Sequence, residues 1–129
     1  LEKFAMSLGV AFQIQDDILG LFGSQKEIGK PIASDIRENQ PNLLIFKTME
    51  LANGKDRKRF KNYLNKEIKQ KEIKNIKRIV KESGALAYCW QKAETFFKQA
   101  RYSLKKIKAP KNQKQFLLDL TDYINARNY

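Results

Sequence analysis

Apolar residues recur along this chain with the spacing of an α-helix, and no segment shows the strict two-residue alternation of a β-strand. The most regular segment repeats an apolar residue at steps of four and three: Leu86, Trp90, Ala93, Phe97, Ala100, Leu104 and Ile107. This spacing puts all of them on one face of a helix about six turns long. We expect that face, with its large aromatic side chains, to pack into the core of a helical bundle.

The first helix is predicted over residues 3–22, where apolar side chains cover nearly every face. A helix of that kind is typically buried inside a bundle. Glycines and a proline predict a loop over residues 22–31. Pro41 suits the first turn of the next helix, and Asn53-Gly54 would end it.

Further helices are predicted in the second part of the chain. Asp56 is a candidate cap for one of them, and residues 70–83 combine an apolar face with a lysine-rich one, up to Ser83-Gly84. After Pro110, a last helix is predicted around residues 116–124. The fold class is therefore predicted to be all-α, a packed helical bundle without internal repeats.

Composition restricts the chemistry of any site. The chain has 129 residues, 42% of them apolar, which suits a folded domain or a part of a larger one. Cys89 is the only cysteine and histidine is absent, which excludes an internal disulfide, a Cys/His zinc site and a histidine-based catalytic triad. A metal must then be held by oxygen atoms, which favours Mg²⁺. Cys89 is expected to be an inert buried thiol.

Charge is distributed unevenly. Residues 1–54 hold five Lys/Arg and seven Asp/Glu, whereas residues 55–129 hold 21 and seven, a net charge of +14. The lysines of residues 55–81 alternate with an apolar face and accompany no nucleic-acid-binding motif, so we interpret them as a solvated helix surface rather than a patch for nucleic acid or an anionic membrane. No apolar run is long enough for a membrane span and no signal peptide is evident, so a cytoplasmic protein is expected.

Two adjacent acids interrupt the apolar first helix. Asp16 follows Phe12 by one helical turn, and Asp17 follows Gln13 in the adjoining row. Carboxylates inside a bundle are costly unless a cation neutralises them, and here that cation is Mg²⁺ or a Lys or Arg. The alternative is that both acids lie on a solvated face. The following loop adds Lys30, whose charge suits a metal-bridged phosphate group.

The segment FQIQDDILGLFGSQKEIGKPIASDIRE, residues 12–38, resembles the second aspartate-rich region of the trans-type polyprenyl diphosphate synthases. That family places Phe-Gln before Asp-Asp, and then a Gly-Lys loop and an Asp ahead of a short charged stretch. Downstream, ESGALAYCWQKAETFFKQA and FLLDLTDYINARNY are similar to the family's C-terminal helices. The resemblance covers residues 1–129 and implies the C-terminal part of the isoprenoid synthase fold.

The resemblance implies Mg²⁺-dependent prenyl transfer, in which an allylic diphosphate condenses with isopentenyl diphosphate and diphosphate is released. It implies that Asp16, Asp17 and Asp35 serve the metal, with Asp16 and Lys30 as the catalytic residues. Phe12, Gln13 and Lys30 would contact substrate, and apolar helix faces would form the tunnel for the growing tail. A homodimer is implied for the intact enzyme, with neither nucleic acid nor a membrane span.

Three departures from the family pattern qualify this expectation. Gly20 stands where a third aspartate is common, and Gln40 and Asn42 stand where the family commonly has lysine and then threonine. The first aspartate-rich motif and the basic residues that bind isopentenyl diphosphate are not in the chain. We therefore expect a C-terminal portion that is inactive alone. The alternatives are a non-catalytic partner subunit of a prenyltransferase and, more remotely, a basic nucleic-acid-binding domain.

Three aromatic side chains and one arginine could be assigned to the substrate site, but each has a simpler structural interpretation. Trp90, Phe96 and Phe97 are expected to belong to the core rather than to contact substrate. Arg127 could reach a diphosphate, as C-terminal basic residues do in the family that this chain resembles. Fraying of the chain end is the default expectation for Arg127.

Overall fold

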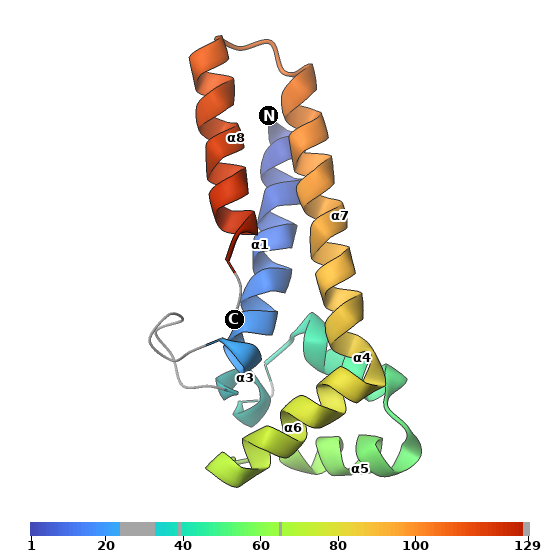
Figure 1. Cartoon of the computed structure of the whole chain (residues 1–129). Helices are drawn as coiled ribbons and strands as arrows, with labels where there is room; N and C mark the ends of the chain where they lie inside the picture. The colour runs from blue at the N-terminus through green and yellow to red at the C-terminus, as the bar shows by residue number, and fades with distance from the viewer. Residues whose placement is uncertain (24–32, 39, 65, 128–129) are drawn as a thin grey trace.

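The structure, a computed structural model, describes residues 1–23, 33–38, 40–64 and 66–127. These residues are arranged in helices without a β-strand, which confirms the predicted all-α class. The three longest helices that run side by side are α1 (Glu2–Phe22), α7 (Ala85–Lys106) and α8 (Lys111–Asn125). In Figure 1, α7 runs antiparallel to both α1 and α8. The predicted loop over 22–31 lies, from residue 24 on, outside the described residues.

Among the described residues, four shorter helices gather at the end of the bundle where α1 stops (Figure 1). They are α3 (Ser34–Arg37), α4 (Leu43–Leu51), α5 (Gly54–Tyr63) and α6 (Gln70–Ser83). The bounds of α6 agree with the prediction from sequence. Gly84 then joins α6 to α7 with a φ of 91°, a backbone conformation that glycine adopts without strain.

The core is built around the contact between α1 and α7, the most extensive in the fold. Ile14 and Ile18 of α1 are buried together with Ala93 and Phe97 of α7. The stripe predicted on α7 is thus confirmed as a core face, although its members Trp90 and Ile107 are only partly buried. Phe96, which was expected in the core, is also only partly buried and packs against it. Cys89 also lies in this core and is fully buried.

Two helix starts differ from the prediction. Pro41 precedes α4 rather than lying in its first turn, because the Asn42 side chain caps this helix by accepting a hydrogen bond of 3.1 Å from the N–H of Ile45. Helix α5 is capped by Asn53, which accepts a 2.8 Å bond from the N–H of Asp56. The expectations that Asp56 caps this helix and that Asn53-Gly54 ends the preceding one were therefore wrong.

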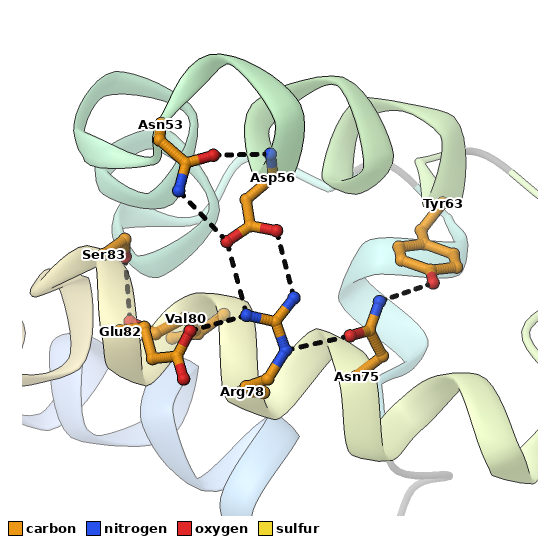
Figure 2. Close-up of polar contacts among 8 residues, drawn as sticks. All are labelled: Asn53, Asp56, Tyr63, Asn75, Arg78, Val80, Glu82 and Ser83. Atoms are coloured by element: carbon orange, nitrogen blue, oxygen red, sulfur yellow. Dashed lines mark hydrogen bonds and ion pairs between the residues drawn. The ribbon is translucent and has the colours of Figure 1, made fainter.

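The Asp56 side chain instead joins α5 to α6. Figure 2 shows the Arg78 guanidinium facing the Asp56 carboxylate, with N···O distances of 3.0 and 3.3 Å. Arg78 also contacts Glu82 and donates to the Asn75 amide oxygen, and the Asn75 amide donates to the Tyr63 hydroxyl. The pKa of Asp56 is lowered, above all by the hydrogen bonds from Arg78.

The basic face of α6 has the arrangement expected of a solvated surface. Lys71, Lys74 and Lys81 are exposed, whereas the opposite face buries Ile76 and Ile79. In the part of the chain that the structure describes, no helix is long and apolar enough to cross a membrane.

The other end of the bundle carries an apolar cleft of about 880 Å³ between the first half of α1 and the last half of α7. Its apolar lining includes Met6, Val10, Phe96, Tyr102 and Ile107. On α8, Phe116 and Tyr123 are 66% and 74% exposed, so the apolar residues that predicted this helix are only partly covered.

Candidate functional site

Asp17 lies in the second half of α1, buried beside the start of α4. Its Oδ1 accepts a 3.0 Å hydrogen bond from the Gln13 side-chain amide, one helical turn away. Its Oδ2 accepts a 3.2 Å hydrogen bond from the backbone N–H of Leu43, the first residue of α4. The i, i+4 row predicted for Gln13 and Asp17 is therefore formed, and a fully solvated position for Asp17 is excluded.

Burial raises the pKa of Asp17 above its ordinary value of 3.8. The hydrogen bonds from Gln13 and Leu43 oppose this shift, while the nearby charges of Asp35 and Asp16 add to it. The desolvated carboxylate would gain most from a cation, since a cation both neutralises the charge and relieves the repulsion among the three acids.

Asp35 approaches from the short helix α3. The backbone N–H of Ala33 donates a 2.9 Å bond to the carbonyl of Gly20, which ties the start of α3 to α1. The Asn42 amide donates a 3.0 Å bond to Oδ2 of Asp35, while the same side chain caps α4. Asn42, which the sequence offered only as a departure from the family pattern, thus holds Asp35 against α4.

A polar cavity of about 410 Å³ opens beside these residues. It is lined by Gln13, Asp17, Ser34, Asp35, Glu38, Gln40 and Pro41. Three predicted site residues, Gln13, Asp17 and Asp35, therefore share one cavity. Glu38 is a further acid at this cavity, one that the sequence did not single out.

The other predicted site residues lie differently. Asp16 is half-buried and has no hydrogen-bond or ion-pair partner in the described residues. Phe12 is 40% exposed and lies beneath the guanidinium of Arg127, 4.4 Å from its ring centroid. Lys30 lies outside the described residues.

The donor chemistry of the cavity fits Mg²⁺. Among the described residues that line it, the side chains that could bind a metal offer oxygen atoms, and Asp17 is a desolvated carboxylate that a cation would stabilise. Among residues 1–23, 33–38, 40–64 and 66–127, no three acids stand close enough to enclose a metal by themselves. Mg²⁺ is commonly bound through one or two carboxylates together with substrate phosphates, and Asp17 and Asp35 suit that arrangement.

Two functional candidates near this site would be hard to find by periodicity. Gln15, which directly precedes the acid pair, is fully buried and holds Arg127 with its side-chain oxygen at 2.8 Å. Arg127 is thus ordered against α1 rather than frayed. The two residues are 112 positions apart, and only the tertiary fold brings them together.

Comparison with known proteins identifies the family and the fold. The polyprenyl synthetase family matches residues 1–82, which include both α1 and α3. The geranylgeranyl diphosphate synthase of Sulfolobus acidocaldarius is 40% identical over 108 residues, 83% of this chain and 32% of that protein. The short chain isoprenyl diphosphate synthase of Methanocaldococcus jannaschii is 37% identical over 130 residues, 100% of this chain and 38% of that protein.

Solved structures agree with this match. Geranylgeranyl pyrophosphate synthetase from Pyrococcus horikoshii Ot3 superposes with a TM-score of 0.85 at 29% identity, covering 98% of this chain and 38% of that one. Geranylgeranyl pyrophosphate synthase from Corynebacterium glutamicum, complexed with isoprenyl diphosphate and magnesium, gives a TM-score of 0.92 at 23% identity, covering 98% and 36%. The second likeness concerns the fold alone.

The arrangement of helices is that of the all-α isoprenoid synthases. The chain belongs to the polyprenyl synthetase family. It spans about a third of the length of the curated relatives named above, 32% and 38%.

Proposed function

We propose that this chain supplies the metal and diphosphate half-site of a short-chain prenyl diphosphate synthase. The observation that supports this most directly is the shared cavity of Gln13, Asp17 and Asp35, in which burial raises the pKa of Asp17. In the proposed reaction the allylic C–O bond breaks and diphosphate leaves. The double bond of isopentenyl diphosphate then forms the new C–C bond, and a proton is lost.

The barrier of such a reaction is governed by the negative charge that grows on the departing diphosphate. Mg²⁺, when bound, would supply positive charge at those oxygens. Asp16, Asp17 and Asp35 are proposed to hold the metal, and Lys30 to contact the diphosphate. Phe12 and Gln13 are proposed to line the reacting end of the substrate, where an aromatic face and a neutral amide exclude water without adding charge.

The Leu43 and Asn42 contacts support this assignment, because they hold the Asp17 and Asp35 carboxylates in place through neutral donors. Asp17 and Asp35 accept hydrogen bonds from a backbone N–H and an amide, respectively; these neutral donors orient the oxygens without cancelling their charge. Residues that orient metal ligands in this way commonly influence metal affinity strongly.

The test uses the longest natural polypeptide that contains this chain. With Mg²⁺, an allylic diphosphate and isopentenyl diphosphate, the protein should release diphosphate and form a longer prenyl diphosphate. Asp16→Ala should lower kcat/KM at least about a thousandfold, as expected when a ligand of an essential metal is removed. Asp119→Ala, which removes an exposed carboxylate on α8, is the matched control and should retain activity.

A second candidate function follows from Gly20 and Gln40. Gly20 is buried, and it occupies the position at which the family commonly has a third aspartate. A non-catalytic partner subunit of a prenyltransferase is therefore the alternative. Inactivity of the intact protein with every allylic primer, together with gain of activity when a catalytic subunit is added, would establish the partner role.

The 129-residue chain alone is proposed to be inactive, because it carries one acidic half-site and spans only about a third of its relatives. The chain alone and the intact protein, assayed at equal molar concentration, distinguish this directly. Turnover by the isolated chain would overturn the half-site proposal.

A further inference from the structure

The last turn of α8 and the residues that follow it are held against α1 by one buried side chain, that of Gln15. The Gln15 amide donates hydrogen bonds to the carbonyl oxygens of Ile124, at 2.8 Å, and of Arg127, at 3.1 Å. Its oxygen accepts a 2.8 Å bond from Nε of Arg127. Gln15 has no exposed surface, so it uses both amide hydrogens and its oxygen on a segment more than a hundred residues away. We call Gln15, Arg127 and the carbonyl of Ile124 the clasp.

Arg127 is held from a second side as well. Its guanidinium lies 4.4 Å from the centroid of the Phe12 ring, a distance typical of a cation–π contact. Its Nη2 atom is buried and has no hydrogen-bond partner among the described residues. Among the described residues, the guanidinium is therefore held by the Gln15 oxygen and the Phe12 ring.

The clasp acts on the stretch of α1 that carries the two acids. Gln15 directly precedes Asp16, and Phe12 lies one helical turn before Asp16 on the same row. Asp17 is oriented independently, through Gln13 and the N–H of Leu43. Asp16 has no partner of its own in the described residues, so the direction of its carboxylate depends on how α1 is rotated about its axis.

We propose that Gln15 and Arg127 are positioning residues, which fix the rotation of α1 at the acid pair and so present Asp16 to metal and diphosphate. The proposal rests on the proposed function, because it assigns the acid pair to a metal-bound diphosphate. Under this proposal, residues 124–127 help to set the orientation of the acids, although they are distant from them in sequence. It does not require Arg127 to touch substrate.

The test compares Arg127→Ala and Arg127→Lys in the longest natural polypeptide that contains this chain. Two quantities are measured: the Mg²⁺ concentration that gives half-maximal turnover, and the rise in Tm produced by Mg²⁺ with inorganic diphosphate. For Arg127→Ala we expect the half-maximal Mg²⁺ concentration to rise about tenfold and the ligand-induced rise in Tm to shrink, as for loss of a group that orients a metal ligand. Arg127→Lys keeps the charge but not the planar fork, and should fall between Arg127→Ala and the unchanged protein.

Arg101→Ala is the matched control, because Arg101 joins α7 to Asp122 of α8 on the surface with a 3.2 Å bond and does not contact Gln15 or Phe12 in the described residues. If Arg127→Ala and Arg101→Ala give the same Mg²⁺ dependence and the same ligand-induced rise in Tm, the clasp has no positioning role. A lower Tm of Arg127→Ala without ligand, together with an unchanged Mg²⁺ dependence of turnover, would also overturn the proposal. That combination is expected of a contact that only stabilises the fold.

The two proposals fail in different ways. If the unchanged protein shows a rise in Tm with Mg²⁺ and diphosphate but no turnover, the transferase proposal fails and the Tm comparison still decides the clasp. If it shows turnover and Arg127→Ala behaves as the control does, only the clasp fails. If the unchanged protein shows neither response, both fail together.

Discussion

The backbone N–H of Leu43 and the Oδ2 atom of Asp17 lie 3.2 Å apart in a hydrogen bond that joins the start of α4 to the acidic stretch of α1. The first N–H groups of a helix have no partner within the helix, so Asp17 satisfies one of them. The positive end of the α4 dipole also favours a negative charge at this point. Burial nevertheless dominates, and the pKa of Asp17 is raised.

The first prediction concerns the cost of this buried charge. A carboxyl group whose folded pKa is raised binds its proton more tightly in the folded state, so folding stability falls as the pH rises from 3.8 through the raised pKa. At neutral pH the ionised Asp17 therefore weakens the ligand-free fold. Asp17→Asn should raise the free energy of unfolding at pH 7 by about 1 kcal/mol, as stabilising changes at functional sites often do.

Urea unfolding of the ligand-free protein at several pH values measures this effect. The gain from Asp17→Asn should be complete above the raised pKa and should disappear below pH 3.8. Asp119→Asn, on an exposed position of α8, controls for a general loss of charge. A neutral-pH loss of stability in Asp17→Asn would show that hydrogen bonding, rather than burial, governs this carboxylate.

The second prediction concerns the link between α5 and α6. The pKa of Asp56 is lowered, chiefly by hydrogen bonds from Arg78. The ionised carboxylate therefore stabilises the fold fully at pH values above 3.8, the ordinary pKa, and this stabilisation is lost as the pH falls through the lowered pKa. Asp56→Asn should therefore destabilise the protein at pH 7, and the difference should vanish in strong acid.

Asp122→Asn is the comparison for Asp56→Asn, measured by urea unfolding at both pH values. The Asp122 side chain is 57% exposed in its pair with Arg101, whereas that of Asp56 is 14% exposed in its pair with Arg78. Exposed ion pairs contribute little, so the loss should be larger for Asp56→Asn. Equal losses in the two variants would show that the Arg78 contacts add nothing beyond an ordinary surface pair.

The third prediction concerns the thiol of Cys89. Desolvation, with a smaller contribution from the charge of Asp17, raises its pKa to about 11. Only the thiolate reacts quickly, so at pH 8 a disulfide reagent should label the folded protein roughly a hundredfold or more slowly than the urea-unfolded one. Labelling at the same rate in both states would contradict the burial of Cys89.

The fourth prediction concerns the core stripe of α7. Phe97 is 1% exposed, and Phe97→Ala should lower the free energy of unfolding by about 3–5 kcal/mol through lost burial and a residual cavity. Phe116→Ala is the matched control, because the Phe116 ring is 66% exposed and should cost less than about 1 kcal/mol. Unfolding in urea measures both, and similar losses would show that Phe97 is not part of the core.

Long periodic helices could be predicted from the sequence, but the starts of α4 and α5 could not. The bounds of α6 follow from a regular apolar face that Ser83-Gly84 ends. At the start of α5 the chain offers two competing caps, Asn53 and Asp56, three residues apart. Asn53 caps the helix and the Asp56 carboxylate pairs with Arg78, a residue 22 positions away that local patterns do not reveal.

In the candidate site, contacts within one helix could be predicted from the sequence, whereas contacts between distant segments could not. Spacing along α1 correctly predicted the row of Gln13 and Asp17, because both lie on one helix. The position of Asp35 beside Asp17 was expected only through the family resemblance, since it depends on how α3 packs against α1. Gln15 and Arg127 were not predicted together, because their contact spans nearly the whole chain and involves backbone carbonyls that carry no sequence signal.

The apolar cleft between α1 and α7 also influences how strongly the isolated chain self-associates in water. Met6, Val10 and Tyr102 lie exposed along a cleft of about 880 Å³, and apolar surface of this kind promotes self-association. The high positive charge of +12 opposes that attraction at low salt, and screening removes the opposition as salt is added. We therefore expect the solubility of the isolated chain to fall as the ionic strength rises.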